Sequence, residues 1–340
     1  MRRATTLLLI LAVVMTAAPA VAGDMALGRA TGDLYRVHDT ERGIAVTQSS
    51  ADGTITESII PQTAELDPTS LGVVVDEPSG SVYVVWQRNQ RYLTSVDFAA
   101  LVDGTWIGPY TLAGNALASA RNPQMLIDTA ETEIEVPAVD EDGEPTTEVL
   151  STTFIHLVWW SHVTEDDPGV AYFGALPLLD DGMPAFEEFD PAPLADLLPY
   201  GIGCSGIGDD ASNLTFPKLF VDPETGNPHV LSTDFSECLF QIIQVLYEVE
   251  DRGEDFIGTK RRRHITVYRV ERTIAVNPQL KLAGASAEVG HDLSIVLHWD
   301  AEDAIDYMQL TQDEASDVRT LKLDGLTHEQ AVELIRSLAR

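Results

Sequence analysis

The chain has 340 residues, of which 44% are hydrophobic, and carries a formal net charge of −33 at pH 7. The hydrophobic fraction is ordinary for a folded protein with a buried core, and the length fits one large domain or two small ones. The negative charge repels nucleic acid and anionic lipid, which excludes both classes as expected partners.

The first 22 residues predict a secretion signal that is removed from the mature protein. Arg2 and Arg3 precede an apolar run at 7–14, and the small residues at 20–22 form a cleavage site. The apolar run is too short to span a membrane comfortably, and no other stretch is a transmembrane candidate. We therefore expect Sec-type export to the periplasm or the medium, a mature chain that begins near Gly23, and no membrane insertion of the mature form.

Residues 33–60 predict three short strands. Gly43 and the Asp52-Gly53 pair interrupt this segment, and Asp-Gly is a strong signal for a hairpin turn. The segment lacks the turn motif of the later units, so we expect a partial unit that pairs with the far end of the chain.

A strand, a turn and a second strand are predicted at 71–87. Val, Tyr and Trp suit a half-buried strand, while Pro78 and Gly80 set the turn. The same pattern recurs later, and each copy is followed by further short β runs. The copies lie at 125–128 with 154–159, at 219–232, and in a weaker form at 285–299.

Four units of four strands follow from this repetition, at 69–112, 122–190, 216–272 and 282–323. Such units, without helices between parallel strands, predict an all-β protein of the β-propeller class over 23–323. We expect about five blades, with insertions at 129–153 and 180–215; a sixth blade in the second insertion is the alternative count. A two-sheet β-sandwich is the alternative fold. Thr327 caps a short amphipathic helix predicted within 324–340.

Residues 75–86 carry the pattern Val-Asp-x-x-x-Gly-x-x-Tyr-Val-Val-Trp, and residues 103–106 are Asp-Gly-Thr-Trp. These motifs resemble those of the sialidase-like, BNR-type propellers of exported bacterial proteins, and the resemblance covers most of 68–323. It implies the propeller fold. Sialidases also use three arginines, a tyrosine nucleophile and an aspartate acid/base. Because Arg36 and Arg42 lie in contexts unlike the family's arginine segment, no catalytic residue is carried over.

Tyr83, His156 and His229 occupy equivalent places in three of the predicted hairpins. Side chains related in this way could surround a central ligand or metal, which makes them binding candidates. Equivalent positions also arise from a shared role in core contacts, and this interpretation is favoured. His298 stands one position further along its strand and interrupts the series. The aspartates at the predicted turn entrances are expected to accept backbone N–H bonds and fix each hairpin. They are Asp76, Asp128 and Asp222.

Charged residues supply two further candidate sites. Asp140, Asp142 and Glu144 place oxygen ligands beside a glycine, which suits calcium, although a solvated acidic loop is favoured. A basic run could grip an acidic ligand, but an acidic run precedes it, so pairing of the two runs in a hairpin is favoured. The basic candidates are Arg261, Arg262 and Arg263.

Cys204 and Cys238 are the two cysteines of the chain. In an exported protein an even count favours a disulfide between them over two free thiols. No C-x-x-C pair is present, so redox chemistry and zinc binding are not predicted.

These features predict a non-catalytic module that binds a glycan or a protein, with no cofactor other than the candidate calcium. The alternative is a glycan-active hydrolase that uses two carboxyl groups roughly 5–10 Å apart near the central channel. An enzyme of this kind should bring Asp, Glu, Tyr or Arg from different blades together. A structural, envelope-associated protein is the third hypothesis.

Overall fold

The computed structural model describes residues 24–90, 93–115, 118–136, 146–163, 169–197, 214–222, 224–234, 239–254, 260–275, 286–290, 293–311 and 314–338. Strands predominate in these ranges, beside one α-helix, α1 (His328–Arg336), and two 3-10 helices, η1 (Phe186–Glu188) and η2 (Leu194–Leu197). None of the described helices is long and apolar enough to cross a membrane. The prediction of an all-β protein is confirmed.

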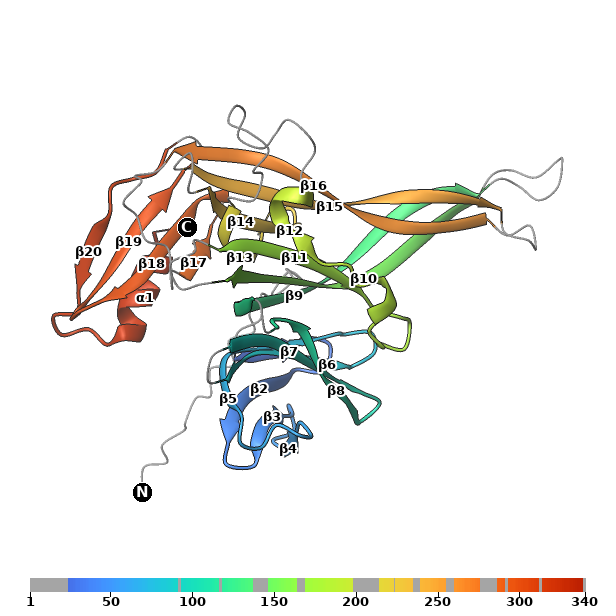
Figure 1. Ribbon diagram of the computed structural model, residues 1–340, viewed down its shortest axis with the longest axis horizontal. Helices are drawn as coiled ribbons and strands as arrows, with labels where there is room; N and C mark the ends of the chain where they lie inside the picture. The colour runs from blue at the N-terminus through green and yellow to red at the C-terminus, as the bar shows by residue number, and fades with distance from the viewer. Residues whose placement is uncertain are drawn as a thin grey trace, which may run out of the picture.

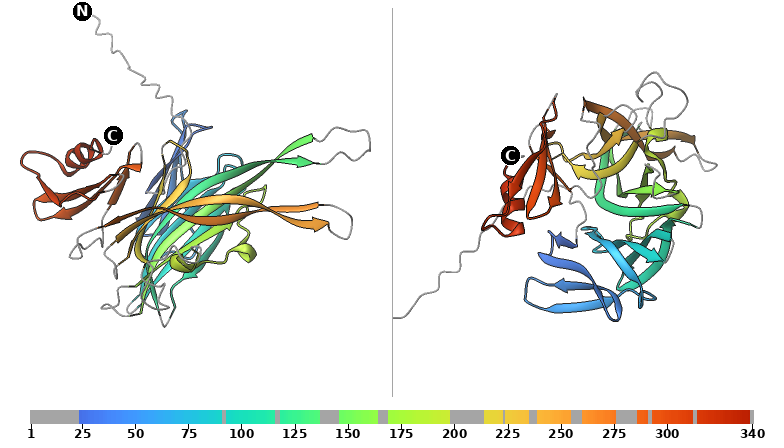
Figure 2. Two further views of the ribbon diagram at one scale, coloured as in Figure 1. Left: turned by 90° about the horizontal axis from the view of Figure 1, so that it is seen from above. Right: turned by 60° about the vertical axis from the view of Figure 1, so that its left-hand side comes forward.

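Five four-stranded antiparallel sheets make up the described chain (Figure 1). In each sheet the strands pair in chain order, so one continuous segment supplies all four strands. The right-hand view of Figure 2 shows the sheets following one another along a curved path, a propeller-like arrangement. Sheet 1 contains β1 (Met25–Gly28), β2 (Asp33–Thr40), β3 (Gly43–Ser49) and β4 (Ile55–Ile59); sheet 2 contains β5 (Asp67–Val75), β6 (Val82–Gln90), β7 (Leu93–Val102) and β8 (Thr105–Ala113). Sheet 3 contains β9 (Ser119–Val136), β10 (Thr146–His162), β11 (Val170–Pro177) and β12 (Ala192–Pro193); sheet 4 contains β13 (Leu214–Val221), β14 (Pro228–Asp234), β15 (Leu239–Glu254) and β16 (Lys260–Ala275). Sheet 5 contains β17 (Ser286–Val289), β18 (Ile295–Ala301), β19 (Ala304–Leu310) and β20 (Arg319–Lys322).

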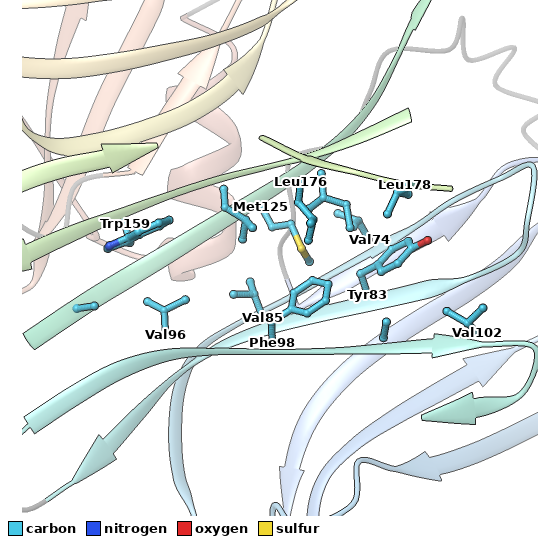
Figure 3. Close-up of a cluster of buried hydrophobic side chains, with 14 residues drawn as sticks. Val74, Tyr83, Val85, Val96, Phe98, Val102, Met125, Trp159, Leu176 and Leu178 are labelled. Carbon is cyan, nitrogen blue, oxygen red and sulfur yellow. The ribbon is translucent and has the colours of Figure 1, made fainter. Parts of the chain in front are cut away.

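A layer of buried apolar side chains separates each pair of neighbouring sheets. In β5, Val73 and Val75 join the layer against sheet 1 while Val74 joins the layer against sheet 3, because successive side chains of a strand alternate between faces. Figure 3 shows the layer between sheets 2 and 3, in which Phe98 and Met125 lie among aliphatic side chains. Burial on both faces explains the nearly continuous apolar runs of the inner strands.

The two ends of this series of sheets differ. Ala331 and Ile335 of α1 cover the outer face of sheet 5, and a capping box between Thr327 and Gln330 starts that helix as predicted. The outer face of sheet 1 has no such cover among the described residues. It exposes a row of apolar side chains, Met25, Leu27, Leu34 and Ile55, whose exposed fractions run from 41% to 70%.

Two expectations about the segments need correction, and a third segment is longer in strand than the sequence suggested. Residues 33–60 do not form a partial unit, because β1 adds a fourth strand and no described residue of sheet 1 pairs with sheet 5. The segment 180–215 contributes β12, which completes sheet 3, so its described part does not begin a sixth sheet. The segment 129–153 lengthens the hairpin between 125–128 and 154–159, since β9 and β10 continue into it as paired strands.

Candidate functional site

Two hairpins extend beyond the sheets to which they belong. The pairing of β9 with β10 continues past the last residues that pair with β11, and we name residues 129–136 and 146–153 arm A. The pairing of β15 with β16 likewise continues past the last residues that pair with β14, and we name residues 245–254 and 260–268 arm B. Both arms project to the same side of the molecule (Figures 1 and 2).

Aromatic rings from both hairpins meet where the arms leave the sheets. Phe154 of β10 stacks on Tyr247 of β15, with ring centroids 4.9 Å apart. His264 of β16 lies edge-on to these two rings, at 6.5 Å and 6.4 Å, and His156 of β10 lies 5.7 Å from Tyr247. Such ring pairs stabilise a contact beyond the area that they bury. With the carboxylate of Asp128, these residues form what we name the root cluster.

Hydrogen bonds run through the root cluster in one direction. The Tyr247 hydroxyl bonds both the Asp128 carboxylate and Nε2 of His156. Because a hydroxyl has one proton and a carboxylate can only accept, we assign that proton to the bond with Asp128, and His156 then donates through Nε2–H. Nδ1 of His156 is left as an unprotonated acceptor, and no described residue donates a hydrogen bond to it.

Burial sets the charges in the root cluster. His156 is completely buried, and desolvation lowers its pKa to about 3, so the imidazole is neutral at pH 7. Desolvation also raises the pKa of the Asp128 carboxyl, against the opposing effect of hydrogen bonds from Thr129 and Tyr247. The cluster therefore holds a neutral histidine and one carboxyl group of raised pKa, an arrangement suited to fixing the arms in place.

The arms also touch face to face near the root. Leu150 of arm A and Phe154, just below the arm, share one face of the β9–β10 hairpin, since successive residues of a strand alternate between its faces. Nε2 of His264 on arm B donates to the backbone carbonyl of Leu150, at 3.1 Å. The opposite face of arm A, which includes Glu131 and Glu133, is exposed. Arm A thus has an inner face against arm B and an outer face in solvent.

Tyr83, His156 and His229 make three separate sets of contacts. The hydroxyl of Tyr83 donates to the carbonyl of Gly182, at 2.6 Å, and so bridges sheets 2 and 3. His156 reaches Tyr247 in sheet 4. Nδ1 of His229 lies 2.9 Å from the carbonyl of Asn227, and its Nε2 lies 2.6 Å from the Glu271 carboxylate within sheet 4. All three side chains are buried, and these contacts connect neighbouring strands and sheets.

Two of the three predicted turn aspartates act as expected. The Asp76 carboxylate accepts from the backbone N–H of Ser79, at 3.2 Å, and Asp222 accepts from that of Glu224, at 3.0 Å. Asp128 accepts a backbone hydrogen bond, from Thr129, but the prediction that it stands at a turn is wrong. Asp128 lies within β9, opposite Phe154, because the residues after it are strand formers and the hairpin turns much later.

The basic run lies on arm B opposite acidic residues. Arg263 pairs in register with Glu250, and its Nε lies 3.1 Å from that carboxylate. Arg262 is in register with Asp251, and Arg261 lies beside it in β16. The hairpin therefore places the two charge runs side by side, as the favoured interpretation predicts.

The other predicted site residues lie outside the described part of the chain. These are the calcium candidates Asp140, Asp142 and Glu144 and the cysteines Cys204 and Cys238. Within the described ranges, no group of three or more His, Cys, Asp or Glu side chains could hold a metal ion.

Sequence reasoning missed the root cluster as a unit. Tyr247 and His264 lie in runs that predict strands and carry no motif. The alternation Thr-Ala-Glu-Thr-Glu-Ile after Asp128, without Gly or Pro, was the available signal that β9 continues as a strand. No known protein family matches the sequence of this chain, and no curated protein is significantly similar to it.

Proposed function

We propose that this chain is an exported, non-catalytic, propeller-type module of the sialidase-like kind that binds a protein partner through arms A and B. We further propose that the five sheets are the blades of one propeller, with α1 between the last blade and the first. The single observation that carries the proposed function is the pair of long hairpins that leave the body together and are joined at their root.

A protein partner is favoured over a glycan by what the arms expose. The stacked rings at the root are turned toward each other, and Phe154 is buried, so its faces are closed to a sugar. Further out, each arm is a two-stranded ribbon that presents backbone groups, charges and β-branched side chains such as Val149, which is exposed. Extended backbone of this kind is recognised mainly by other polypeptides.

A glycan-active hydrolase is the second candidate, and one observation favours it. The raised pKa of Asp128 is a property of a general acid, and Asp128 meets Tyr247 from a different sheet. Glycoside hydrolysis ordinarily needs a second carboxyl group, and the root cluster contains one carboxylate. The cluster is also filled by rings in mutual contact. The binding module is therefore the better account.

The test compares the full chain with a variant in which residues 133–149 of arm A are replaced by Asn-Gly. Both proteins would be applied to protein and glycan arrays, with calcium or with chelator, and assayed on fluorogenic sialosides and common glycosides. We expect binding to a protein partner that is lost in the shortened variant, no glycoside turnover, and similar unfolding of both proteins. A matched control shortens the exposed β3–β4 turn at Asp52 and Gly53. Turnover of any glycoside, or binding that survives arm shortening, would overturn the proposed function.

A further inference from the structure

One edge of arm A has backbone groups that point away from its partner strand. The backbone N–H of Leu178 bonds the carbonyl of Thr153, at 2.8 Å, so Thr153 directs its backbone groups away from β9. The pairing of β10 with β9 is continuous from Thr153 to the described end of the arm. The β9 residues opposite Thr153, Ser151 and Val149 therefore direct their backbone N–H and C=O groups away from β10. Those residues are Thr129, Glu131 and Glu133, and no described strand pairs with them.

The same edge carries charge of one sign. Glu131 and Glu133 are both exposed on the outer face. They are two residues apart, which is the spacing of side chains on one face of a strand, so alternate side chains of an added strand would lie opposite them. Arm A contains four Glu and no Asp, Lys or Arg. Arm B contains four Asp or Glu and five Lys or Arg, and there Arg263 already pairs with Glu250. Arm B is thus compensated within itself, whereas arm A is not.

We propose that the free edge of β9 in arm A binds an extended polypeptide segment that has Lys or Arg at every second position, by β-strand addition. This inference rests on the proposed function and names the chemistry of its partner. The added strand takes its backbone hydrogen bonds from Glu131 and Glu133, and its basic side chains stand directly opposite the two carboxylates.

The charge of the edge also determines what it rejects. A free strand edge is a template for any other strand, and proteins commonly protect such edges with charge. Two copies of this chain carry −33 each, and like charges directly opposite each other in a sheet are destabilising. Glutamates on arm A therefore disfavour pairing with another copy, while they leave a basic strand as the matching occupant. That selectivity would be absent if the edge carried both signs of charge, as arm B does.

The experiment uses the full chain and a labelled peptide of alternating lysine and threonine, with binding measured by fluorescence anisotropy at low salt. A second peptide has the same charges but N-methyl groups on alternate amides, which removes the donors needed for pairing. The variant Glu131→Gln/Glu133→Gln removes the facing carboxylates. The control Glu250→Gln removes a carboxylate from arm B.

We expect the plain peptide to bind, the N-methylated peptide to bind at least about tenfold more weakly, and the double variant to lose about tenfold in affinity. The control should retain its affinity, and hydrogen exchange at the amides of Glu131 and Glu133 should slow when the plain peptide is bound. If both peptides bound with equal affinity, charge alone would account for the binding, and strand addition would be overturned. Absence of peptide binding, while the array partner still requires arm A, would overturn this inference and leave the proposed function standing. If shortening arm A leaves array binding unchanged, the proposed function itself fails.

Discussion

Replacement of His156 by glutamine should remove a large part of the acid sensitivity of this protein. His156 is completely buried, and desolvation lowers its pKa to about 3. The pKa of a histidine in an unfolded chain is about 6.5. The folded state therefore binds fewer protons than the unfolded state between these values. The contribution of neutral His156 to stability is complete above the unfolded pKa and is lost as the pH falls toward the folded one.

The magnitude follows from these two pKa values. Proton linkage gives a loss of about 2 kcal/mol at pH 5 relative to pH 7, where the loss is close to zero. Glutamine does not titrate in this range, and its side-chain amide can donate to the Tyr247 hydroxyl as Nε2–H of the histidine does. Urea denaturation at pH 7 and pH 5 should thus show a smaller acid loss in His156→Gln than in the wild type, by about 2 kcal/mol.

The control for this experiment is His328→Gln, because His328 lies at an exposed helix end next to Asp300. General titration of the many carboxylates affects all three proteins alike, so the comparison isolates His156. If His156→Gln and the wild type lose the same stability between pH 7 and pH 5, the assignment of a buried neutral imidazole is refuted.

Three further substitutions test the root cluster, arm B and the layers of the fold by urea denaturation. Tyr247→Phe should lower stability by about 1–3 kcal/mol because it leaves buried polar groups without their partner, while Tyr110→Phe, on an exposed ring, should have little effect. Arg263→Ala should cost less than about 1 kcal/mol, and the difference should vanish in high salt, since its pair with Glu250 is exposed. Phe98→Ala should cost about 3–5 kcal/mol, whereas Ile55→Ala, on the uncovered face of sheet 1, should change stability by no more than about 0.5 kcal/mol. A loss at Ile55 as large as that at Phe98 would mean that the outer face of sheet 1 is covered.

Much of the fold could be predicted from the sequence because each hairpin carries its own local signals. In 71–87 the β-branched runs and the turn residues specify β5, the turn and β6 without reference to the rest of the chain. The strands β1 and β12 were missed for the opposite reason. They have four and two residues, too few for any periodicity, and only their pairing with β2 and β11 makes them strands.

The candidate site was predictable only in fragments. Opposite charges on arm B lie close together in the sequence, so their pairing across a hairpin could be inferred from spacing. The root cluster joins residues of separate hairpins, such as Phe154 and Tyr247, and no local pattern reports such a contact. Asp128 was misread because it follows an apolar run, as Asp76 and Asp222 do. The residues that follow each aspartate distinguish the cases. Pro and Gly follow Asp76 and Asp222 and end their strands, whereas Thr and Glu follow Asp128 and continue β9.

The root cluster and the proposed binding edge are expected to depend on each other. A two-stranded ribbon alone is at best marginally stable in water, so arm A needs its contacts with arm B to keep its strands in register. Those contacts are the stack of Phe154 on Tyr247 and the bond from His264 to the Leu150 carbonyl. Tyr247→Phe retains the stack but removes the hydroxyl, so the loss of peptide affinity should be small. Tyr247→Ala removes both and should weaken binding of the lysine–threonine peptide severalfold, although Tyr247 lies on the other arm from Glu131. Unchanged affinity in Tyr247→Ala would show that arm A keeps its register without arm B, and that the root cluster serves only stability.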